Sequence, residues 1–187
     1  MKQNVDTLTG YQVTLRPVEL SDLDMLRQWR NSPQVSQYML SQSIITQEQQ
    51  LAWFKKIERD DSQQHFMIGY KDSLIGSLNI KSKLVGESLA QASVIEPGLY
   101  IADDRYRSNI IAFSPTLLIN DYCFEQLNCD KLVAVVKPDN HAALNYNTKL
   151  GYKVVKHGEL IEIELNFDDY QDHSKSLKAL LSHNTSR

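Results

Sequence analysis

The segment from Asn140 to Tyr152 constrains the fold of this chain more than any other part of the sequence. Asn140 is a residue type that caps helices, because its side chain can accept a hydrogen bond from a free amide of the first turn. Gly151 suits the position just after a helix, where a left-handed backbone conformation ends it. Tyr152 then opens an apolar stretch. The segment therefore predicts a capped helix that leads directly into a strand.

A second informative block runs from Glu96 to Ala112. It predicts an apolar strand, a polar turn and then a long helix that continues through Leu127. The first amides of a helix have no partners within the helix, and they lie at the positive end of its dipole. A turn of this kind is therefore suited to binding a phosphate group.

The two blocks together resemble the GCN5-related N-acetyltransferases (GNAT). Asn-x-x-Ala…Lys-Leu-Gly-aromatic resembles the last conserved block of the family, and Arg107–Ala112 resembles its Arg/Gln-x-x-Gly-x-Gly/Ala loop. The resemblance implies a mixed α/β (α+β) fold in which two central parallel strands splay apart, here the strands ending at Ala102 and Lys137. It also implies an acetyl-CoA-dependent N-acetyltransferase that needs no metal.

The resemblance further implies which residues hold acetyl-CoA. The strand offers its backbone to the pantetheine, the turn offers amides to the pyrophosphate, and the capped helix lies near the thiol. The matching positions are Tyr100, Ile101, Ala102, Arg107, Ser108, Asn109, Ile110, Ile111, Ala112, Asn140 and Asn147.

Two of these positions depart from the family pattern. Ile110 replaces a glycine, and a β-branched residue with positive φ would be an outlier. We therefore expect Ile110 in right-handed helical geometry with its side chain turned away from the phosphates; the alternative is a rebuilt loop that binds CoA weakly or not at all. Asn147 replaces the tyrosine that protonates the thiolate, and an amide cannot act as a general acid. Water is then the expected proton source, and Tyr146 is expected to pack.

Glu96 is the candidate general base. Related GNAT branches carry a glutamate two residues before a Gly-aromatic pair on this strand, and Glu96-Pro97-Gly98 fits that register. A base is needed to take a proton from the attacking amine. The alternative is an exposed strand carboxylate without a role.

The N-terminal third bears on the acceptor. Its Trp-Arg-Asn run and later aromatic pair resemble two branches, the ribosomal-protein N-terminal acetyltransferases and the amino-sugar acetyltransferases of pseudaminic acid synthesis. The resemblance suggests that Arg30 binds a diphosphate and that Met39 and Trp53 line a uracil pocket. The alternative is that the aromatic side chains belong to the core and that Arg30 merely ends a helix.

Three functions remain open at this point. The first is direct acetyl transfer to the primary amine of a small amino-sugar nucleotide. The second is N-terminal acetylation of a protein, and the third is a non-catalytic GNAT-fold binding module. The acceptor cannot be chosen from the sequence, because variable loops such as 36–46 and 84–92 would hold it.

Composition agrees with a GNAT enzyme. The chain has 187 residues, which predicts a single domain over 1–187 with a frayed segment 1–9 and a C-terminal helix and tail over 168–187. The balance of 20 basic and 23 acidic residues argues against a nucleic-acid partner. No apolar run is long enough to cross a membrane, and the N-terminus has no signal-peptide pattern. Scattered histidines and two cysteines predict no metal site. We expect a cytoplasmic protein with a small-molecule amine partner; a homodimer remains open.

Local patterns predict the remaining elements. Apolar alternation and capping residues indicate eight segments: strands over Tyr11–Val18, His65–Tyr70, Leu74–Lys83, Lys131–Lys137, Tyr152–Lys156 and Glu159–Phe167, a helix opened by Ser21, and a helix opened by a capping box at Thr46–Gln49. The turn Lys71–Ser73 joins two of these strands as a hairpin. An amphipathic segment over Tyr170–Leu181 closes the chain.

Overall fold

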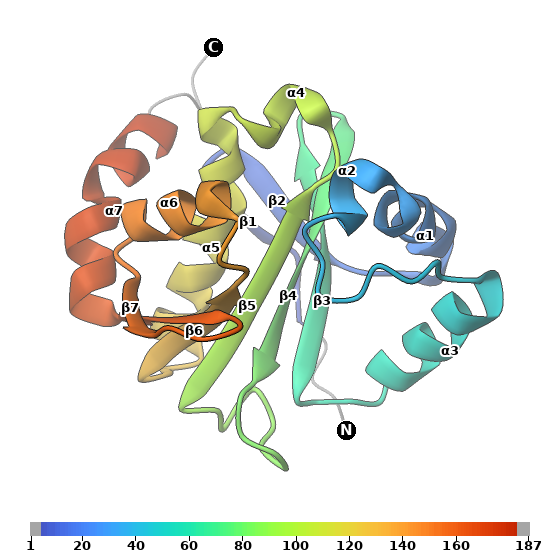
Figure 1. The fold of residues 1–187 in the computed structure, drawn as a ribbon, viewed down its shortest axis with the longest axis horizontal. Coiled ribbons are helices and arrows are strands. Elements are labelled where there is room, and N and C mark those ends of the chain that lie inside the picture. The colour runs from blue at the N-terminus through green and yellow to red at the C-terminus, as the bar shows by residue number, and fades with distance from the viewer. Residues whose placement is uncertain (1–4, 183–187) are drawn as a thin grey trace.

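The computed structural model describes residues 5–182, which form an eight-stranded sheet flanked by helices (Figure 1). The strand order is β1-β2-β3-β4-β5-β6-β8-β7. Every neighbouring pair is antiparallel except β5 and β6, which are parallel. The strands are β1 (Leu8–Gly10), β2 (Val13–Pro17), β3 (Gln63–Tyr70), β4 (Ser73–Ser82), β5 (Val94–Ile101), β6 (Lys131–Val136), β7 (Lys153–Lys156) and β8 (Ile161–Asn166).

Helices cover both faces of this sheet. They are α1 (Leu23–Asn31), α2 (Pro33–Ser36), α3 (Gln47–Ile57), α4 (Asp104–Arg107), α5 (Ser114–Asp121), α6 (His141–Lys149) and α7 (Phe167–Ser182), with 3₁₀ turns η1 (Leu20–Asp22) and η2 (Ile110–Phe113) and a π-helical turn η3 (Tyr122–Gln126). Helix α5 packs on β1 and β2, α7 packs on β8 and α5, and α3 packs on β3 and α1. No helix within residues 5–182 is long and apolar enough to cross a membrane.

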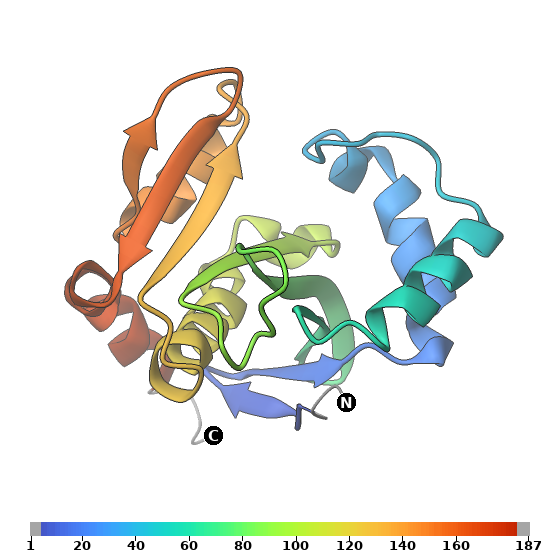
Figure 2. The ribbon, with the colours of Figure 1, turned by 90° about the horizontal axis from the view of Figure 1, so that it is seen from below.

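The sheet opens between its two parallel strands. β5 and β6 pair only at Val94–Lys131 and Ile95–Leu132, the first residues of each strand. Figure 2 shows the result: β6, β8, β7 and α6 form one arm, α1 to α3 form the other, and β5 lies at the base between them. The splayed parallel strands expected from the sequence are therefore present.

The prediction of a single long helix after Asp104 is wrong. The chain instead forms α4, η2, α5 and η3 in succession. Asn109 has an extended backbone, with φ −93° and ψ 156°, which interrupts the helix after α4. Pro115 lies in the first turn of α5, where its missing N–H costs no hydrogen bond. Two local helix-start signals thus override the apolar periodicity.

The N-terminal residues also differ from expectation. Residues 1–9 were expected to fray, but Leu8–Gly10 forms β1 and pairs with β2. Tyr11 and Gln12 make the turn between them with φ of 49° and 71°, so β2 begins at Val13 rather than at Tyr11. Residues 1–4 and the tail residues 183–187 lie outside the described part of the chain.

Other local predictions are confirmed. Thr46 and Gln49 form the capping box of α3, and Lys71 takes the left-handed conformation in the β3–β4 turn with φ 52°. Asn140 caps α6 by accepting a 3.1 Å hydrogen bond from the Ala143 amide. Gly151 has φ +100°, and a Cβ there would lie 2.7 Å from the Asp169 carbonyl oxygen. A glycine is therefore required where the chain leaves α6.

The C-terminal helix starts earlier than its amphipathic pattern indicates. It begins at Phe167, because the Asn166 side chain accepts a 2.8 Å hydrogen bond from the Asp169 amide. Tyr170 and Lys178 both donate to the Asp121 carboxylate at 2.7 Å, and so attach α7 to the end of α5. Helix α7 is thus an integral part of the arm that carries β6.

Candidate active site

The edge of β5 that faces the cleft has backbone groups without strand partners. Hydrogen bonds of 2.9 Å from the Lys83 amide to the Val94 carbonyl and of 2.8 Å from the Ala102 amide to the Ile75 carbonyl tie even-numbered β5 residues to β4. Because successive residues of a strand direct their backbone groups to opposite sides, the odd-numbered residues face β6. Beyond Ile95, β6 no longer pairs with β5. Unpaired donors and acceptors therefore line the cleft.

Three residues occupy that free edge: Pro97, Leu99 and Ile101. Pro97 has no N–H, which a central strand would not tolerate, but here its nitrogen faces the cleft and no ladder bond is lost. Leu99 and Ile101 retain their amides. This edge matches the amide-rich pantetheine of acetyl-CoA, and Leu99 is a backbone contact that sequence reasoning did not include.

Arg107 closes the end of the same strand. Its guanidinium donates to the carbonyl oxygens of Ile101 and Ala102 at 3.0 and 3.1 Å, and it forms a 2.6 Å ion pair with Asp104. The positive charge is therefore used to hold the turn after β5. Arg107 supports the turn, and the backbone amides that follow are the remaining candidates for phosphate donors.

Those amides belong to η2. Ile110 is its first residue, so the Ile110 N–H has no acceptor within that helix. The next amide, of Ile111, donates to the Asn109 side chain at 3.1 Å, and the Ala112 amide donates to the Asn109 carbonyl at 3.0 Å. Ser108 ends α4 and is exposed. The turn thus offers one free amide, and Asn109 occupies the second.

Ile110 has the conformation expected from its side chain. It is not among the residues with positive φ, and its side chain is 44% exposed. The right-handed geometry predicted for this departure from the glycine pattern is therefore present. Whether the loop binds the pyrophosphate remains a prediction.

Three polar side chains of α6 and its cap form hydrogen bonds with backbone groups of α6 itself or of η2. Asn140 is occupied as the helix cap, and the Asn147 amide donates to the Ala143 carbonyl at 2.9 Å. Tyr146 donates to the Ala112 carbonyl at 2.8 Å, and its ring stacks on Phe113 with centroids 4.4 Å apart. Burial raises the pKa of Tyr146, so the phenol stays protonated. Tyr146 packs α6 against the phosphate turn, as expected.

Glu96 lies on the face of β5 that α1 covers. Its carboxylate forms a 2.8 Å ion pair with Lys83, and its side chain is 31% exposed. Gly98 lies next on the same face, where a Cβ would come within 3.2 Å of the Asn79 side chain, and Tyr100 follows, with its ring 6.4 Å from that of Trp29 on α1. Glu96 is thus a partly accessible carboxylate on β5, and Lys83 is a partner that sequence reasoning missed.

Arg30 of α1 lies close enough to Tyr100 of β5 for its charge to act on the phenol. Burial raises the pKa of Tyr100, while the nearby positive charge of Arg30 opposes that shift. Arg30 forms no ion pair with any residue in 5–182, and its Nε is buried without a hydrogen-bond partner. Trp29 contacts the Tyr100 ring, so it packs between helix and sheet. An unpaired, partly buried guanidinium is a candidate anion-binding group.

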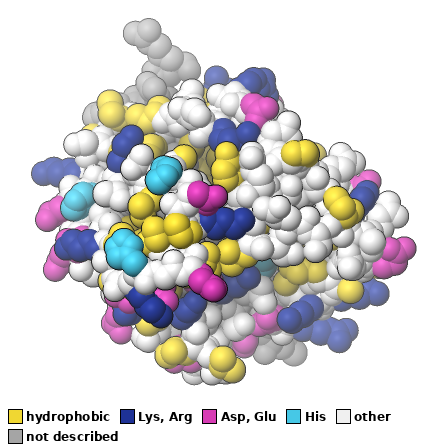
Figure 3. Space-filling model, viewed as in Figure 1, with side chains coloured by type: hydrophobic (Ala, Val, Ile, Leu, Met, Phe, Trp, Pro, Cys, Tyr) yellow, Lys and Arg dark blue, Asp and Glu magenta, His cyan; other side chains and the backbone are white. Residues whose placement is uncertain are grey.

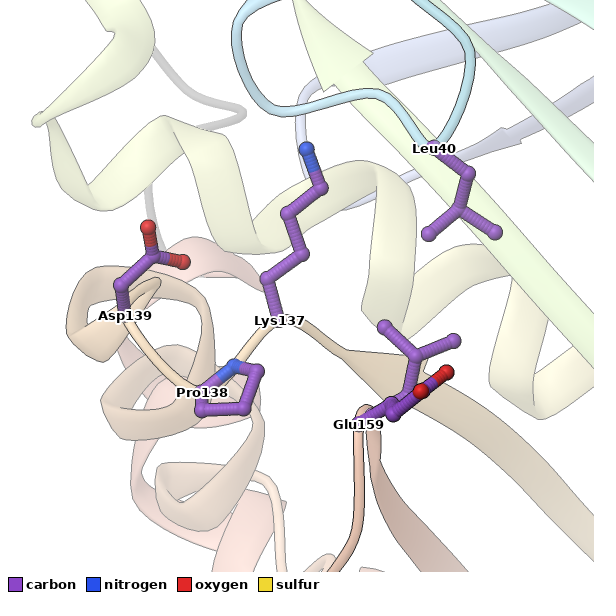
Figure 4. Close-up of a pocket in the computed structure, with 6 residues that line it drawn as sticks. Leu40, Lys137, Pro138, Asp139 and Glu159 are labelled. Atoms are coloured by element: carbon purple, nitrogen blue, oxygen red, sulfur yellow. The ribbon is translucent and has the colours of Figure 1, made fainter.

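A depression of about 560 Å³ lies between the two arms. Leu40 borders it from the segment after α2, and the other lining residues come from the end of β6 and the β7–β8 turn (Figure 4): Lys137, Pro138, Asp139, Glu159 and Leu160. Lys137 extends its ammonium toward the Leu40 segment and has no ion pair among the described residues. On this face of the molecule apolar, basic and acidic side chains are intermixed (Figure 3).

The structure describes the surroundings of Met39 and Trp53, and their expected role in lining a uracil pocket stays a prediction. Trp53 packs edge-on against His65, with ring centroids 5.0 Å apart, and Phe54 is buried in the core. Met39 is half-buried, and the depression is lined by its neighbour Leu40 instead. The packing alternative holds for Trp53 and Phe54, because helical spacing turns both toward β3.

The acceptor-side arm is positioned by two polar contacts. Arg16 and Asp22 form a bidentate pair at 2.7 Å where β2 leads into α1. Burial alone would raise the pKa of Asp22, but hydrogen bonds from Arg16 and from the Glu19 amide lower it below its ordinary value. At the other end of α1, Asn31 binds both the carbonyl and the amide of Ile45, at 2.9 and 2.8 Å.

No cluster of three metal-ligating side chains occurs within residues 5–182. Cys123 and Cys129 are buried free thiols, and burial raises the pKa of both, that of Cys129 to about 11. Neither thiol is therefore a nucleophile at neutral pH. The chemistry of the cleft rests on carboxylate, amide and cationic groups.

Comparison with known proteins identifies the family. Residues 12–153 match the family model described as an acetyltransferase (GNAT) domain. The chain belongs to the GNAT family. It is an N-acetyltransferase with the mixed-sheet GNAT fold, as the sequence predicted, and its acetyl donor is acetyl-CoA. This membership argues against the non-catalytic module.

Two relatives, one of them also a solved structure, resemble this chain. It is 29% identical over 126 residues to acetyltransferase PseH of Campylobacter jejuni, which covers 66% of this chain and 71% of that protein. It is 27% identical over 156 residues to spermidine N(1)-acetyltransferase of Escherichia coli, which covers 82% and 78%. The crystal structure of Campylobacter jejuni PseH with acetyl coenzyme A superposes with a TM-score of 0.62 at 19% identity, covering 83% of this chain and 99% of that one.

Proposed function

We propose that this GNAT enzyme transfers an acetyl group directly to the primary amine of a nucleotide-linked amino sugar. The observation that carries the proposal is Arg30, whose buried Nε has no partner and whose positive charge lies near Tyr100 of β5. A guanidinium fork matches the paired oxygens of a diphosphate. PseH is one of the relatives, and the amino-sugar branch is one of the two branches that the Trp-Arg-Asn run resembles.

Lys137 supports the same acceptor. Its ammonium extends into the depression from the arm opposite Arg30 and has no ion pair among the described residues. Two unpaired cations on opposite arms can bind an anionic acceptor that spans the cleft. Leu40 and Leu160 supply apolar surface against which a ring can pack.

The roles of the chain's own residues follow from their places. The Leu99 and Ile101 amides and the η2 amide at Ile110 would hold acetyl-CoA, whose thioester supplies the activated acetyl group. Glu96 accepts the proton that the acceptor amine loses as its nitrogen bonds to the acetyl carbon. Lys83, at 2.8 Å, orients the Glu96 carboxylate for that role. Water supplies the proton for the departing thiolate, because Asn147 cannot.

A polyamine is the second candidate acceptor. Asp139 and Glu159 line the depression without cationic partners among the described residues, and carboxylates are what a polycation requires. The spermidine N(1)-acetyltransferase relative covers more of the chain than PseH does. We rank it second because it leaves Arg30 and Lys137 without a role.

The test compares acceptors in one assay of acetyl-CoA consumption: a UDP-linked amino sugar, spermidine, and a peptide with a free N-terminal alanine. The proposal predicts turnover with the sugar nucleotide, and UDP alone should raise the melting temperature of the protein by mass action. Arg30→Lys should remove that stabilisation, because lysine keeps the charge but loses the fork. Arg105→Lys, on the exposed turn after β5, is the matched control.

Turnover of spermidine without any response to UDP would show that the acceptor is a polyamine and would overturn the proposal. Turnover of the peptide alone would favour N-terminal acetylation of a protein. We place the reaction in the cytoplasm, where the two buried free thiols would remain reduced.

A further inference from the structure

Asn79 of β4 lies on the same face of the sheet as the candidate base Glu96. It pairs directly with Gly98 of β5, and directly paired residues of antiparallel strands direct their side chains to one face. Glu96, Gly98 and Tyr100 share that face, because the side chains of a strand alternate. Asn79 therefore belongs to the floor between the candidate base and Tyr100.

The carboxamide of Asn79 leans over Gly98 toward β5. A Cβ on Gly98 would lie 3.2 Å from Asn79 Oδ1, 3.8 Å from its Cγ and 3.9 Å from its Nδ2. The space that a side chain at Gly98 would need is thus taken by this carboxamide, with its oxygen nearest. Glu96 is the diagonal neighbour of Asn79 across the two strands, and such neighbours lie about 7–8 Å apart. One small group can therefore contact both side chains.

The Asn79 carboxamide is open to a ligand. It forms no hydrogen bond with another described residue. The residue is half-buried, and neither its oxygen nor its nitrogen is among the fully enclosed atoms without a partner, so both atoms reach solvent. Trp53 of α3 packs on His65, which pairs with Asn79 from β3, and Trp29 of α1 packs on Tyr100. These aromatic contacts lie to either side of Asn79 and leave its carboxamide free.

The acetyl-transfer step gives such a group a role. An attacking primary amine has a lone pair and two hydrogens. As its nitrogen bonds to the acetyl carbon and the carbon–sulfur bond breaks, one hydrogen leaves as a proton to Glu96, and the thiolate takes its proton from water. The second hydrogen stays on the nitrogen of the product amide. A carboxamide oxygen can accept a hydrogen bond from it without competing for the proton.

We propose that Asn79 Oδ1 accepts this retained N–H and so directs the lone pair of the acceptor amine at the acetyl carbon. The proposal rests on the proposed function, because it takes Glu96 as the base, but it applies to any primary amine. The same contact makes the enzyme selective for primary over secondary amines. An N-methyl amine has a single N–H, which Glu96 takes, and Asn79 is then left without a donor.

The experiment compares kcat/KM for a primary amine and for its N-methyl derivative at saturating acetyl-CoA. The amine is the one that wild type acetylates among the UDP-linked amino sugar, spermidine and the alanine peptide. Wild type should prefer the primary amine at least about tenfold, the effect of one hydrogen bond. Asn79→Ala should lower kcat/KM about tenfold for the primary amine and leave the N-methyl amine unchanged, so that the preference disappears.

Two further variants separate this role from a structural one. Asn79→Asp keeps an oxygen acceptor at the same place and should retain the preference. Lys81→Ala, two residues away on the same strand and face, is the matched control and should show the wild-type ratio. Thermal melting confirms that each variant folds.

An equal loss for both amines in Asn79→Ala, or an unchanged preference, would overturn the proposal. Acetylation of spermidine alone would overturn the proposed acceptor instead, and the ratio measured on spermidine and its N-methyl derivative would still decide the role of Asn79.

Discussion

The two segments that border the cleft are held in opposite ways. Residues 102–113, the cofactor segment, are held by hydrogen bonds of three side chains. Arg107 donates to the Ile101 carbonyl, the Asn109 side chain caps η2, and Tyr146 donates to the Ala112 carbonyl. Residues 32–46, the acceptor segment, are held by the buried Val35 of α2 and by the Asn31–Ile45 clamp, and they expose Tyr38, Leu40 and Ile44 by 51%, 67% and 70%.

This difference agrees with the ligands expected on each side, acetyl-CoA at the cofactor segment and the amine acceptor at the acceptor segment. Acetyl-CoA is common to the family, and a rigid turn can bind it at low entropic cost. Acceptors vary between relatives, and a loosely held apolar segment can adapt to them. Substitutions in one segment should therefore change the kinetics of one ligand only.

The largest effect is expected at Glu96, the proposed general base. Glu96→Gln removes the proton acceptor but keeps the shape of the side chain, so turnover should fall about 10²–10⁴-fold. Acetyl-CoA affinity should change little. Steady-state kinetics with a saturating acceptor measure this split, and Lys81→Gln on the neighbouring strand is the control. An unchanged turnover would assign the proton to water.

The next effect concerns the support of the acceptor arm. Asp22→Asn breaks the bidentate pair with Arg16 and should lower the free energy of unfolding by about 3 kcal/mol. The pKa of Asp22 is lowered in the folded chain, so its stabilisation is complete above the unfolded pKa of about 3.9 and is lost as the pH falls through the lower folded value. Urea unfolding from pH 7 to pH 2.5 should show wild type losing stability relative to Asp22→Asn as Asp22 becomes protonated. Parallel curves would contradict the assignment.

A smaller effect is expected from the clamp of the acceptor segment. Asn31→Ala removes two hydrogen bonds to Ile45, each contributing about 1 kcal/mol. The KM for the acceptor should rise about tenfold, while the Kd for acetyl-CoA stays unchanged. Gln42→Ala, which removes only an exposed 3.2 Å bond within the segment, is the control. A parallel loss of cofactor affinity would show that the two segments are coupled.

The smallest effect is expected in the cofactor segment. Asn109→Ala frees the Ile111 amide for the pyrophosphate and should tighten acetyl-CoA binding a few-fold, although loss of the cap lowers stability by about 1 kcal/mol. Asn109→Asp keeps the cap but adds a negative charge, so it should weaken binding. Calorimetry decides between them. Equal affinity in both variants would mean that the phosphates bind elsewhere.

Sequence reasoning succeeded where a signal is local. The Asn140 cap, the Gly151 stop and the Thr46 capping box each depend on a few neighbouring residues, and all are present. The long helix after Asp104 was wrong because apolar periodicity hid two local signals, the Asn109 cap and Pro115.

The site was less predictable because it depends on strand register and arm placement. Glu96 meets Lys83 only through the β4–β5 pairing, and the free edge at Leu99 exists only because β6 diverges after Leu132. Arg107 could be assigned to the turn, but its bonds to the end of β5 could not. Long-range geometry, rather than residue type, decides these roles.

The most direct test of this account is acetyl-CoA binding to the free edge of β5. Calorimetry should compare wild type with Leu99→Pro, which removes the amide facing the cleft, and with Leu99→Ala, which removes only the side chain. Thermal melting confirms that both variants fold. We predict that wild type and Leu99→Ala bind alike, while Leu99→Pro binds at least about tenfold more weakly, the effect of losing one hydrogen bond of about 1.4 kcal/mol. Unchanged binding by folded Leu99→Pro, or no binding by wild type at millimolar acetyl-CoA, would contradict the account.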